Sequence, residues 1–138
     1  MSPNRVLSFI ATALTLSIAA GAHAQGTWPD KPVRFIVPLP PGGPSDIVLR
    51  GAIEKMQATL KQPLIVDNKP GAAGNLGASE AARAAPDGYT WLWTTDTLVT
   101  VNPHVYPKLA FRPEDLQPVM RASSFSQSAL SPSAAASA

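Results

Sequence analysis

The stretch that decides the fold is Pro40-Pro41-Gly42-Gly43-Pro44-Ser45-Asp46, called here the first glycine stretch. An apolar run that includes Val33–Val37 stops at it, and the apolar residues of Ile47–Leu60 then recur at helical spacing. When a strand passes through a glycine-rich turn into a helix, the unpaired N–H groups of the first helical turn point outward and favour anions. The sequence therefore predicts an anion-accepting turn between a strand and a helix.

A second strand and a second glycine-rich turn follow along the chain. The β-branched run Leu64–Val66 leads into the second glycine stretch, Gly71–Gly77, and alanine-rich helical sequence continues over Ala78–Ala85. Bulky and small residues then alternate over Tyr89–Thr95, which indicates a third strand. Strands that alternate with helices over short connections favour an α/β fold with a doubly wound parallel sheet, whose ligands bind beyond the carboxyl ends of the strands. Both glycine stretches are predicted at such ends.

The composition limits the classes of function. The chain has 138 residues, a formal net charge of +2 and no cysteine. Its lysines and arginines are scattered along the sequence, whereas a nucleic-acid surface needs them clustered. We therefore expect no nucleic-acid partner, no disulfide and no thiolate metal site.

The N-terminus has the pattern of a secretory signal peptide. A short basic segment ending at Arg5 precedes an apolar run over Val6–Ala20, and Ala22-His23-Ala24 has the form of a cleavage site. The alternative, a membrane anchor, is disfavoured because the run is short for a spanning helix and no basic stop follows it. We predict a signal peptide over residues 1–24 and export to the periplasm.

Enzyme and cofactor motifs are absent from the sequence. The second glycine stretch fails the dinucleotide pattern because Ala72 stands where the tight-turn glycine belongs, and neither stretch leads into a phosphate-binding Gly-Lys-Ser/Thr. His104 is the only histidine after the predicted cleavage site, and a hydrolase built on the first stretch would depend on it. The sequence predicts no catalytic residue, no metal site and no cofactor.

Roles within the two stretches stay open from the residues alone. Gly42, Gly43 and Ser45 suit ligand contacts and an ordinary turn equally well, whereas Asp46 is predicted to cap the helix because its carboxylate would repel an anion. The threonines that end the third strand are hydroxyl donors or ordinary strand residues. Trp91 and Trp93 share one strand face and are expected in the core.

The sequence signal is weaker towards the C-terminus. Pro118–Ala122 suggests a fourth strand, and residues 123–138 form a tail rich in Ser and Ala. With little bulky apolar material, this tail is expected to be disordered or loosely helical, or read out of frame.

Five separated motifs carry a resemblance to a known family. They are Trp28-Pro29-Asp30-Lys31-Pro32-Val33-Arg34, Ile36-Val37-Pro38 with Pro40-Pro41-Gly42-Gly43 and Asp46, Asn68–Ala72 with Gly74–Gly77, Ala85–Thr90, and Val101-Asn102-Pro103 with Tyr106–Leu109. In order and spacing they resemble the N-terminal part of the Bug family, the periplasmic solute-binding receptors of tripartite tricarboxylate transporters. The resemblance covers Trp28 to about Ala122, and Leu39 departs from it because an aromatic residue is common there.

The resemblance implies a periplasmic-binding-protein-like (Venus flytrap) fold, of which residues 25–122 are part of the first domain. Two α/β domains would close on a small carboxylate, held by main-chain groups of two strand-to-helix loops. Carried onto this sequence, the ligand-binding residues are Pro41, Gly42, Gly43, Ser45, Ala72, Gly74, Asn75, Thr95 and Thr97.

The resemblance also implies partners and a length. The family's chains are more than twice as long, which leads us to expect a truncated or frameshifted receptor with poor affinity. The leading hypothesis is a receptor that delivers a small carboxylate to membrane transporter subunits. The alternative is a small exported α/β interaction domain that binds no ligand.

Overall fold

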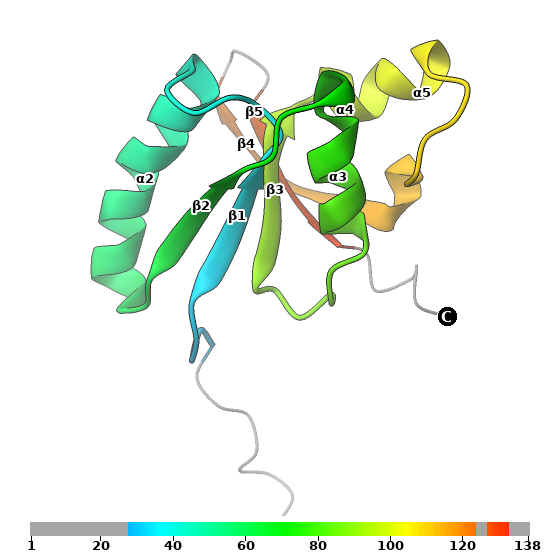
Figure 1. Cartoon of the computed structure of the whole chain (residues 1–138). Helices are drawn as coiled ribbons and strands as arrows, with labels where there is room; N and C mark the ends of the chain where they lie inside the picture. Colours follow the sequence, from blue (N-terminus) through cyan, green and yellow to red (C-terminus); the bar gives the residue numbers. More distant parts are fainter. Residues whose placement is uncertain (1–27, 124–126, 133–138) are drawn as a thin grey trace, which may run out of the picture. The chain divides into compact units, whose positions relative to one another are not determined.

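The computed structural model describes residues 28–123 and 127–132 (Figure 1). The chain divides into two units between Asp30 and Lys31, and every helix and strand described below belongs to the unit that begins at Lys31. The predicted signal peptide lies outside the described residues and stays a prediction. Among the residues described, no helix has the length and apolar character that crossing a membrane requires.

Five strands form one mixed sheet in the order β2-β1-β3-β5-β4. β1 runs parallel to β2 and β3, whereas β5 runs antiparallel to both β3 and β4. The elements in chain order are β1 (Val33–Val37), α2 (Pro44–Leu60), β2 (Leu64–Asn68), η1 (Ala72–Gly74), α3 (Asn75–Ala82), β3 (Thr90–Thr95), α4 (Thr97–Thr100), α5 (Asn102–Val105), η2 (Pro113–Asp115), β4 (Leu116–Ser123) and β5 (Gln127–Pro132). The predicted parallel strands and the fourth strand are confirmed.

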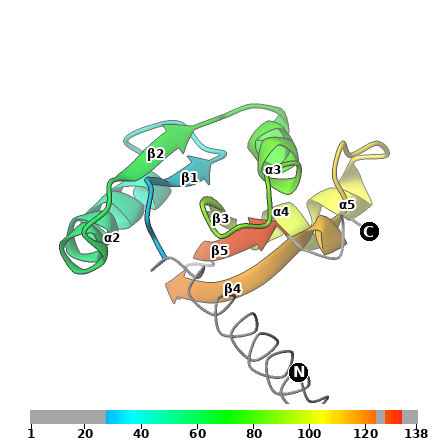
Figure 2. The same cartoon turned by 90° about the horizontal axis from the view of Figure 1, so that it is seen from below.

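Helices cover both faces of this sheet (Figures 1 and 2). Alternate residues of a strand point to opposite faces. Val33, Phe35 and Val37 accordingly pack with buried side chains of α2, whereas Ile36 packs with those of α3 and α4. A sheet covered on both sides explains why β1 is apolar throughout.

The first long helix differs in detail from the prediction. α2 begins at Pro44, three residues before Ile47, because Pro fits the first turn of a helix. Of the apolar residues that recur at helical spacing, Leu49 and Ile53 are buried, but Met56 is 37% exposed. The buried side of the helix is therefore narrower than the sequence pattern suggests.

The expectation that the Ser/Ala tail is disordered or loosely helical is wrong for Gln127–Pro132. These residues form β5, which lies between β3 and β4 in the sheet. Ala129 and Leu130 are buried on opposite faces, in the α2 and α3 cores respectively. Backbone pairing with two strands orders a segment whose composition lacks bulky side chains. The rest of the tail, 124–126 and 133–138, lies outside the described residues.

Candidate functional site

Three connections lie together at the carboxyl edge of the parallel strands, the upper end of the sheet in Figure 1. Loop 1 (residues 38–43) follows β1, loop 2 (residues 69–74, including η1) follows β2, and Asp96 with α4 follows β3. Parallel pairing of β1 with both other strands puts their carboxyl ends side by side. The edge where the sequence predicts a ligand is therefore built from all three connections.

Loop 1 leads into α2, whose N-terminus has no side-chain cap. Gly43 is the N-cap residue of α2, and no side-chain hydrogen bond caps this end. Gly42 has φ +79°, in the left-handed region that favours glycine, and a Cβ added there would have no heavy atom within 4 Å. Loop 1 thus leaves open space beside the start of α2.

The prediction that Asp46 caps the helix is wrong. Asp46 lies inside the first turn of α2 and is buried, with its side chain directed back at loop 1. Its carboxylate accepts hydrogen bonds from the Gly42 N–H (3.0 Å), Arg50 Nε (2.8 Å) and Asn68 Nδ2 (3.0 Å). Asn68 Nδ2 also donates to the Leu39 carbonyl at 3.1 Å. We call Asp46, Arg50 and Asn68 the loop 1 brace, because together they hold loop 1 to the end of β2.

The loop 1 brace also lowers the pKa of Asp46 to about 2. The largest cause is the hydrogen bond from Arg50, and the bonds from Gly42 and Asn68 act in the same direction against the effect of burial. Asp46 is therefore ionised at neutral pH, and Arg50 compensates its charge.

Loop 2 has an unusual backbone. Four consecutive residues have positive φ: Gly71 (137°), Ala72 (48°), Ala73 (54°) and Gly74 (89°). A left-handed conformation costs an L-residue about 1–2 kcal/mol, and glycine avoids this cost. Strain of this kind persists only where surrounding contacts hold it, and it concentrates at functional sites.

Packing explains two glycines of the second stretch. A Cβ on Gly74 would lie 2.8 Å from Leu98 Cδ1, and one on Gly77 would lie 2.9 Å from Pro38 Cβ. The absence of side chains here lets loop 2 and α3 approach loop 1 and α4 closely. The two glycines therefore bring the three connections together.

Asn102 holds loop 2 in place, and sequence reasoning gave this residue no role. It begins α5, is buried, and donates from Nδ2 to the Ala73 carbonyl (3.0 Å) and to Asn75 Oδ1 (2.8 Å). The available signal was the Val101-Asn102-Pro103 motif, which contributed only to the family resemblance.

The end of β3 and the start of α4 carry two hydroxyl groups, and β3 also anchors the start of α2. Thr95 Oγ1 and Thr97 Oγ1 share a hydrogen bond of 2.7 Å at the end of β3. Trp93 is buried, as predicted, and its Nε1 donates to the Ser45 carbonyl at 3.1 Å. The indole thus fixes the start of α2 against the middle of the sheet.

The structure brings the sequence-predicted ligand residues to one edge, with different accessibility. The exposed members are Pro41, Gly42, Ala72 and Thr97; the half-buried members are Gly43, Asn75 and Thr95; and the buried members are Ser45 and Gly74. Ser45 and Gly74 have the least surface to offer a ligand. A contact role for each residue stays a prediction.

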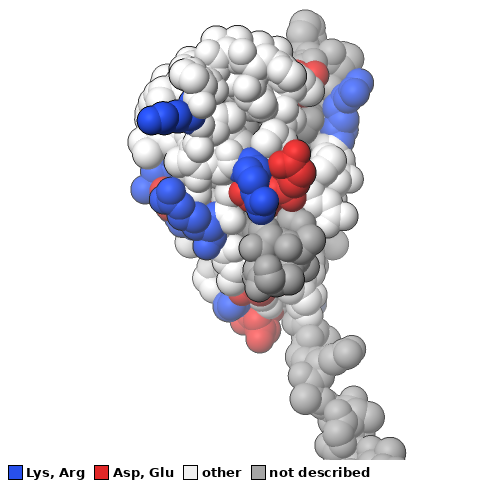
Figure 3. Space-filling view, turned by 90° about the vertical axis from the view of Figure 1, so that its right-hand side faces the viewer, with Lys and Arg blue, Asp and Glu red and all other residues white. Residues whose placement is uncertain are grey.

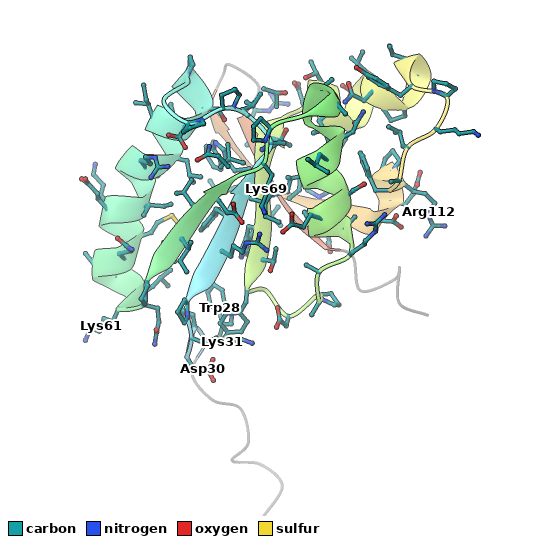
Figure 4. The ribbon with its side chains drawn as sticks, in the orientation of Figure 1. Trp28, Asp30, Lys31, Lys61, Lys69 and Arg112 are labelled. Atoms are coloured by element: carbon teal, nitrogen blue, oxygen red, sulfur yellow. The ribbon has the colours of Figure 1, made fainter. Side chains whose placement is uncertain are left out.

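Charged side chains on the α3 side of the sheet neutralise one another. Arg34 Nη2 pairs with both Asp67 and Glu80, and Lys69 Nζ lies 3.7 Å from Asp67 Oδ2 and 3.6 Å from Glu80 Oε2. Lys69 comes from loop 2, beside α3, whereas Lys61 and Arg112 point away from the fold (Figure 4). The lysine nearest the candidate site is thus already paired.

Other chemistry finds little support in the described part of the chain. Residues 28–123 and 127–132 contain no group of three or more His, Asp or Glu side chains that could hold a metal ion. His104 is exposed. The face seen in Figure 3 is mostly uncharged, and its basic side chains are separate instead of forming a continuous patch.

These features define an α/β domain of the periplasmic-binding-protein class, with loops at the carboxyl edge of a mixed sheet. Solved structures support this class. The chain resembles the periplasmic binding protein BugD (36% identity, TM-score 0.61), Rpa4515 of R. palustris with adipate (32%, 0.64) and MatC of Rhodopseudomonas palustris with bound malate (39%, 0.62). Each match covers 67% of this chain and 31–32% of the other. Only the first domain of these structures is matched, and the predicted fold class is confirmed.

The chain belongs to the tripartite tricarboxylate transporter family receptors, whose family model matches residues 48–137. A UPF0065 protein of Bordetella pertussis is 44% identical over 119 residues, which is 86% of this chain and 36% of the relative. Protein BugT of the same organism is 34% identical, over 86% of this chain and 37% of the relative. The predicted Bug resemblance is confirmed, and the chain spans about a third of the length of these relatives.

Proposed function

We propose that this chain forms the ligand-binding edge of a periplasmic receptor for a small carboxylate, which the receptor delivers to a tripartite transporter in the membrane. Membership of the receptor family is the observation that carries the proposal. The signal-peptide pattern of residues 1–24 and the likeness to a periplasmic binding protein support the location. Receptors of this family bind and release, so no catalytic role is proposed.

The geometry of the carboxyl edge supports an anionic ligand. α2 begins there without a side-chain cap, and helix starts favour negative charge. Asp46, a buried carboxylate nearby, has its charge compensated by Arg50. The structures of similar proteins with malate and with adipate suggest a dicarboxylate of that size.

An NMR titration of the whole chain with malate, adipate and citrate tests the proposal. We expect amide signals of Gly42, Gly43, Ala72 and Asn75 to move, together with those of Thr95 and Thr97. Lys61 and Gly88, at the opposite ends of the strands, provide internal controls that stay still. Malamide, the neutral diamide of malate, should cause much smaller shifts.

The competing hypothesis is the exported interaction domain without a ligand. It predicts no shift with any of the three acids, and that outcome overturns the proposed receptor function for this chain. Shifts spread evenly over the sheet, or equal shifts with malamide, would also contradict it, because they indicate non-specific binding.

A further inference from the structure

We propose that Asn102 is a positioning residue that turns the amide of Asn75 so that its N–H₂ group is presented at the carboxyl edge. The inference rests on the proposed carboxylate receptor function and assigns a source of specificity within the same site. Asn102 belongs to the Val101-Asn102-Pro103 motif, and its side chain contacts both loop 2 and Asn75.

The orientation follows from which atoms can donate. The backbone carbonyl of Ala73 only accepts, so the Asn102 atom 3.0 Å away must be the amide nitrogen. That same nitrogen lies 2.8 Å from the side chain of Asn75, which must therefore offer its oxygen. The Ala73 carbonyl thus determines the orientation of both side-chain amides. The distance between the two amides alone would not distinguish oxygen from nitrogen in either one.

A fixed position for the Asn75 oxygen also fixes the position of its nitrogen, because both atoms are bonded to Cγ in one planar amide group. Among the described residues, no hydrogen bond involves Asn75 Nδ2. Asn75 is half-buried and begins α3, directly after the left-handed turn of loop 2. Its two N–H groups are donors, which suit carboxylate oxygens and not cationic groups.

Asn102 also secures the backbone that carries Asn75. Ala72 and Ala73 have φ of 48° and 54°, which alanine adopts only at a cost. The bond from buried Asn102 to the Ala73 carbonyl is a contact from outside the loop that opposes relaxation of this turn. Loss of Asn102 should therefore disturb both the turn and the amide.

The test uses the whole chain with Asn102→Ala, and with Val105→Ala as a matched control. Val105 is 64% exposed on the same short helix, so its truncation should change nothing. Without ligand, Asn102→Ala should shift the Asn75 side-chain amide signals and move the Cα signals of Ala72 and Ala73. Malate affinity should fall about tenfold, the loss expected for one misdirected hydrogen bond.

The isosteric variant Asn102→Asp tests the direction of these hydrogen bonds, because it replaces the donor N–H₂ group by an acceptor. Its carboxylate would place an acceptor against the Ala73 carbonyl and Asn75 Oδ1, so Asn75 should reverse its amide and malate affinity should fall more than in Asn102→Ala. If both variants fail to fold, wild-type spectra decide: slow exchange of the Asn102 amide protons and their proximity to Asn75 are expected. Fast exchange would overturn the inference.

Two further outcomes separate this inference from the receptor function. If Asn102→Ala lowers thermal stability but leaves the Asn75 signals and the malate affinity unchanged, Asn102 has a structural role only. That result would overturn the inference that Asn102 orients the amide of Asn75. If wild type binds none of malate, adipate and citrate, the receptor function fails. The ligand-free spectra then still decide whether Asn102 orients Asn75.

Discussion

Replacing Asp46 by Asn should destabilise the fold in a pH-dependent way. The substitution keeps the size of the buried side chain but removes the charge that Arg50 and the Gly42 N–H stabilise. An amide offers one acceptor oxygen where the carboxylate offers two, so the loop 1 brace loses at least one hydrogen bond. The expected result is a lower free energy of unfolding and a looser loop 1.

The magnitude follows from the pKa of Asp46. Folding lowers this pKa from 3.8 to about 2. At about 1.4 kcal/mol per pKa unit, the charged form contributes at most roughly 2 kcal/mol. Because the Arg50 side chain is 53% exposed, solvent screens part of the pair, and we expect about 1–2 kcal/mol.

The sign of the pH dependence is set by the lowered pKa. The contribution of Asp46 is fully present above the unfolded pKa of 3.8 and is lost as the pH falls through the folded value of about 2. Wild type and Asp46→Asn should therefore differ most near neutral pH. The difference should shrink between about pH 4 and pH 2.

Urea unfolding of the whole chain at several pH values measures this difference. Glu54→Gln is the matched control, because Glu54 is exposed on the same helix and should leave stability unchanged. Equal stability of wild type and Asp46→Asn at pH 7 would refute the role of the loop 1 brace. A difference that persists undiminished at pH 2 would show that the carboxylate charge is not its cause.

Three further substitutions test packing and backbone strain by urea unfolding. Gly77→Ala places a Cβ 2.9 Å from Pro38 and should cost about 1–3 kcal/mol, and an unchanged midpoint would contradict the close approach. Ala73→Gly relieves a φ of 54° and should stabilise by up to about 1 kcal/mol, with destabilisation as the contrary result. Leu130→Ala should cost about 2–5 kcal/mol because Leu130 is 2% exposed, whereas Val119→Ala, on exposed surface of β4, should change little; equal effects would argue against β5 as a core strand.

The sequence was most informative where local pattern and burial agree. The apolar run at β1 and the turn at Gly42 and Gly43 sufficed to place a buried strand before a helix, because a strand covered on both faces needs apolar side chains throughout. β5 could not be predicted in this way. Its order comes from pairing with β3 and β4, and Leu130 fills a core formed by residues far away in sequence.

The candidate site was predictable as a place but not as a set of contacts. Glycine stretches after β1 and β2 indicated which edge carries the site, since parallel strands share their carboxyl edge. The role of Asp46 depends on Asn68, 22 residues later, and that of Asn102 on Ala73, 29 residues earlier. Such partners are fixed only by the tertiary fold, so local capping rules gave Asp46 the wrong role.

The two loops are held by the same device. In each, an asparagine 29 residues beyond a loop carbonyl donates to it from Nδ2: Asn68 to Leu39 and Asn102 to Ala73. Each amide nitrogen also donates to a side-chain oxygen in the first turn of the helix that follows the loop. The acceptor is Asp46 of α2 for Asn68, and Asn75 of α3 for Asn102.

The difference between the two loops lies in that second partner. Asp46 is a carboxylate with no proton to donate at neutral pH, and Arg50 is needed to balance its charge. Asn75 is neutral and keeps two N–H groups after its oxygen is engaged. Of the two residues that take this second bond, only Asn75, which follows loop 2, can offer an anion a side-chain N–H donor, beside the hydroxyl groups of Thr95 and Thr97. Loop 1 can contribute backbone N–H groups and open space.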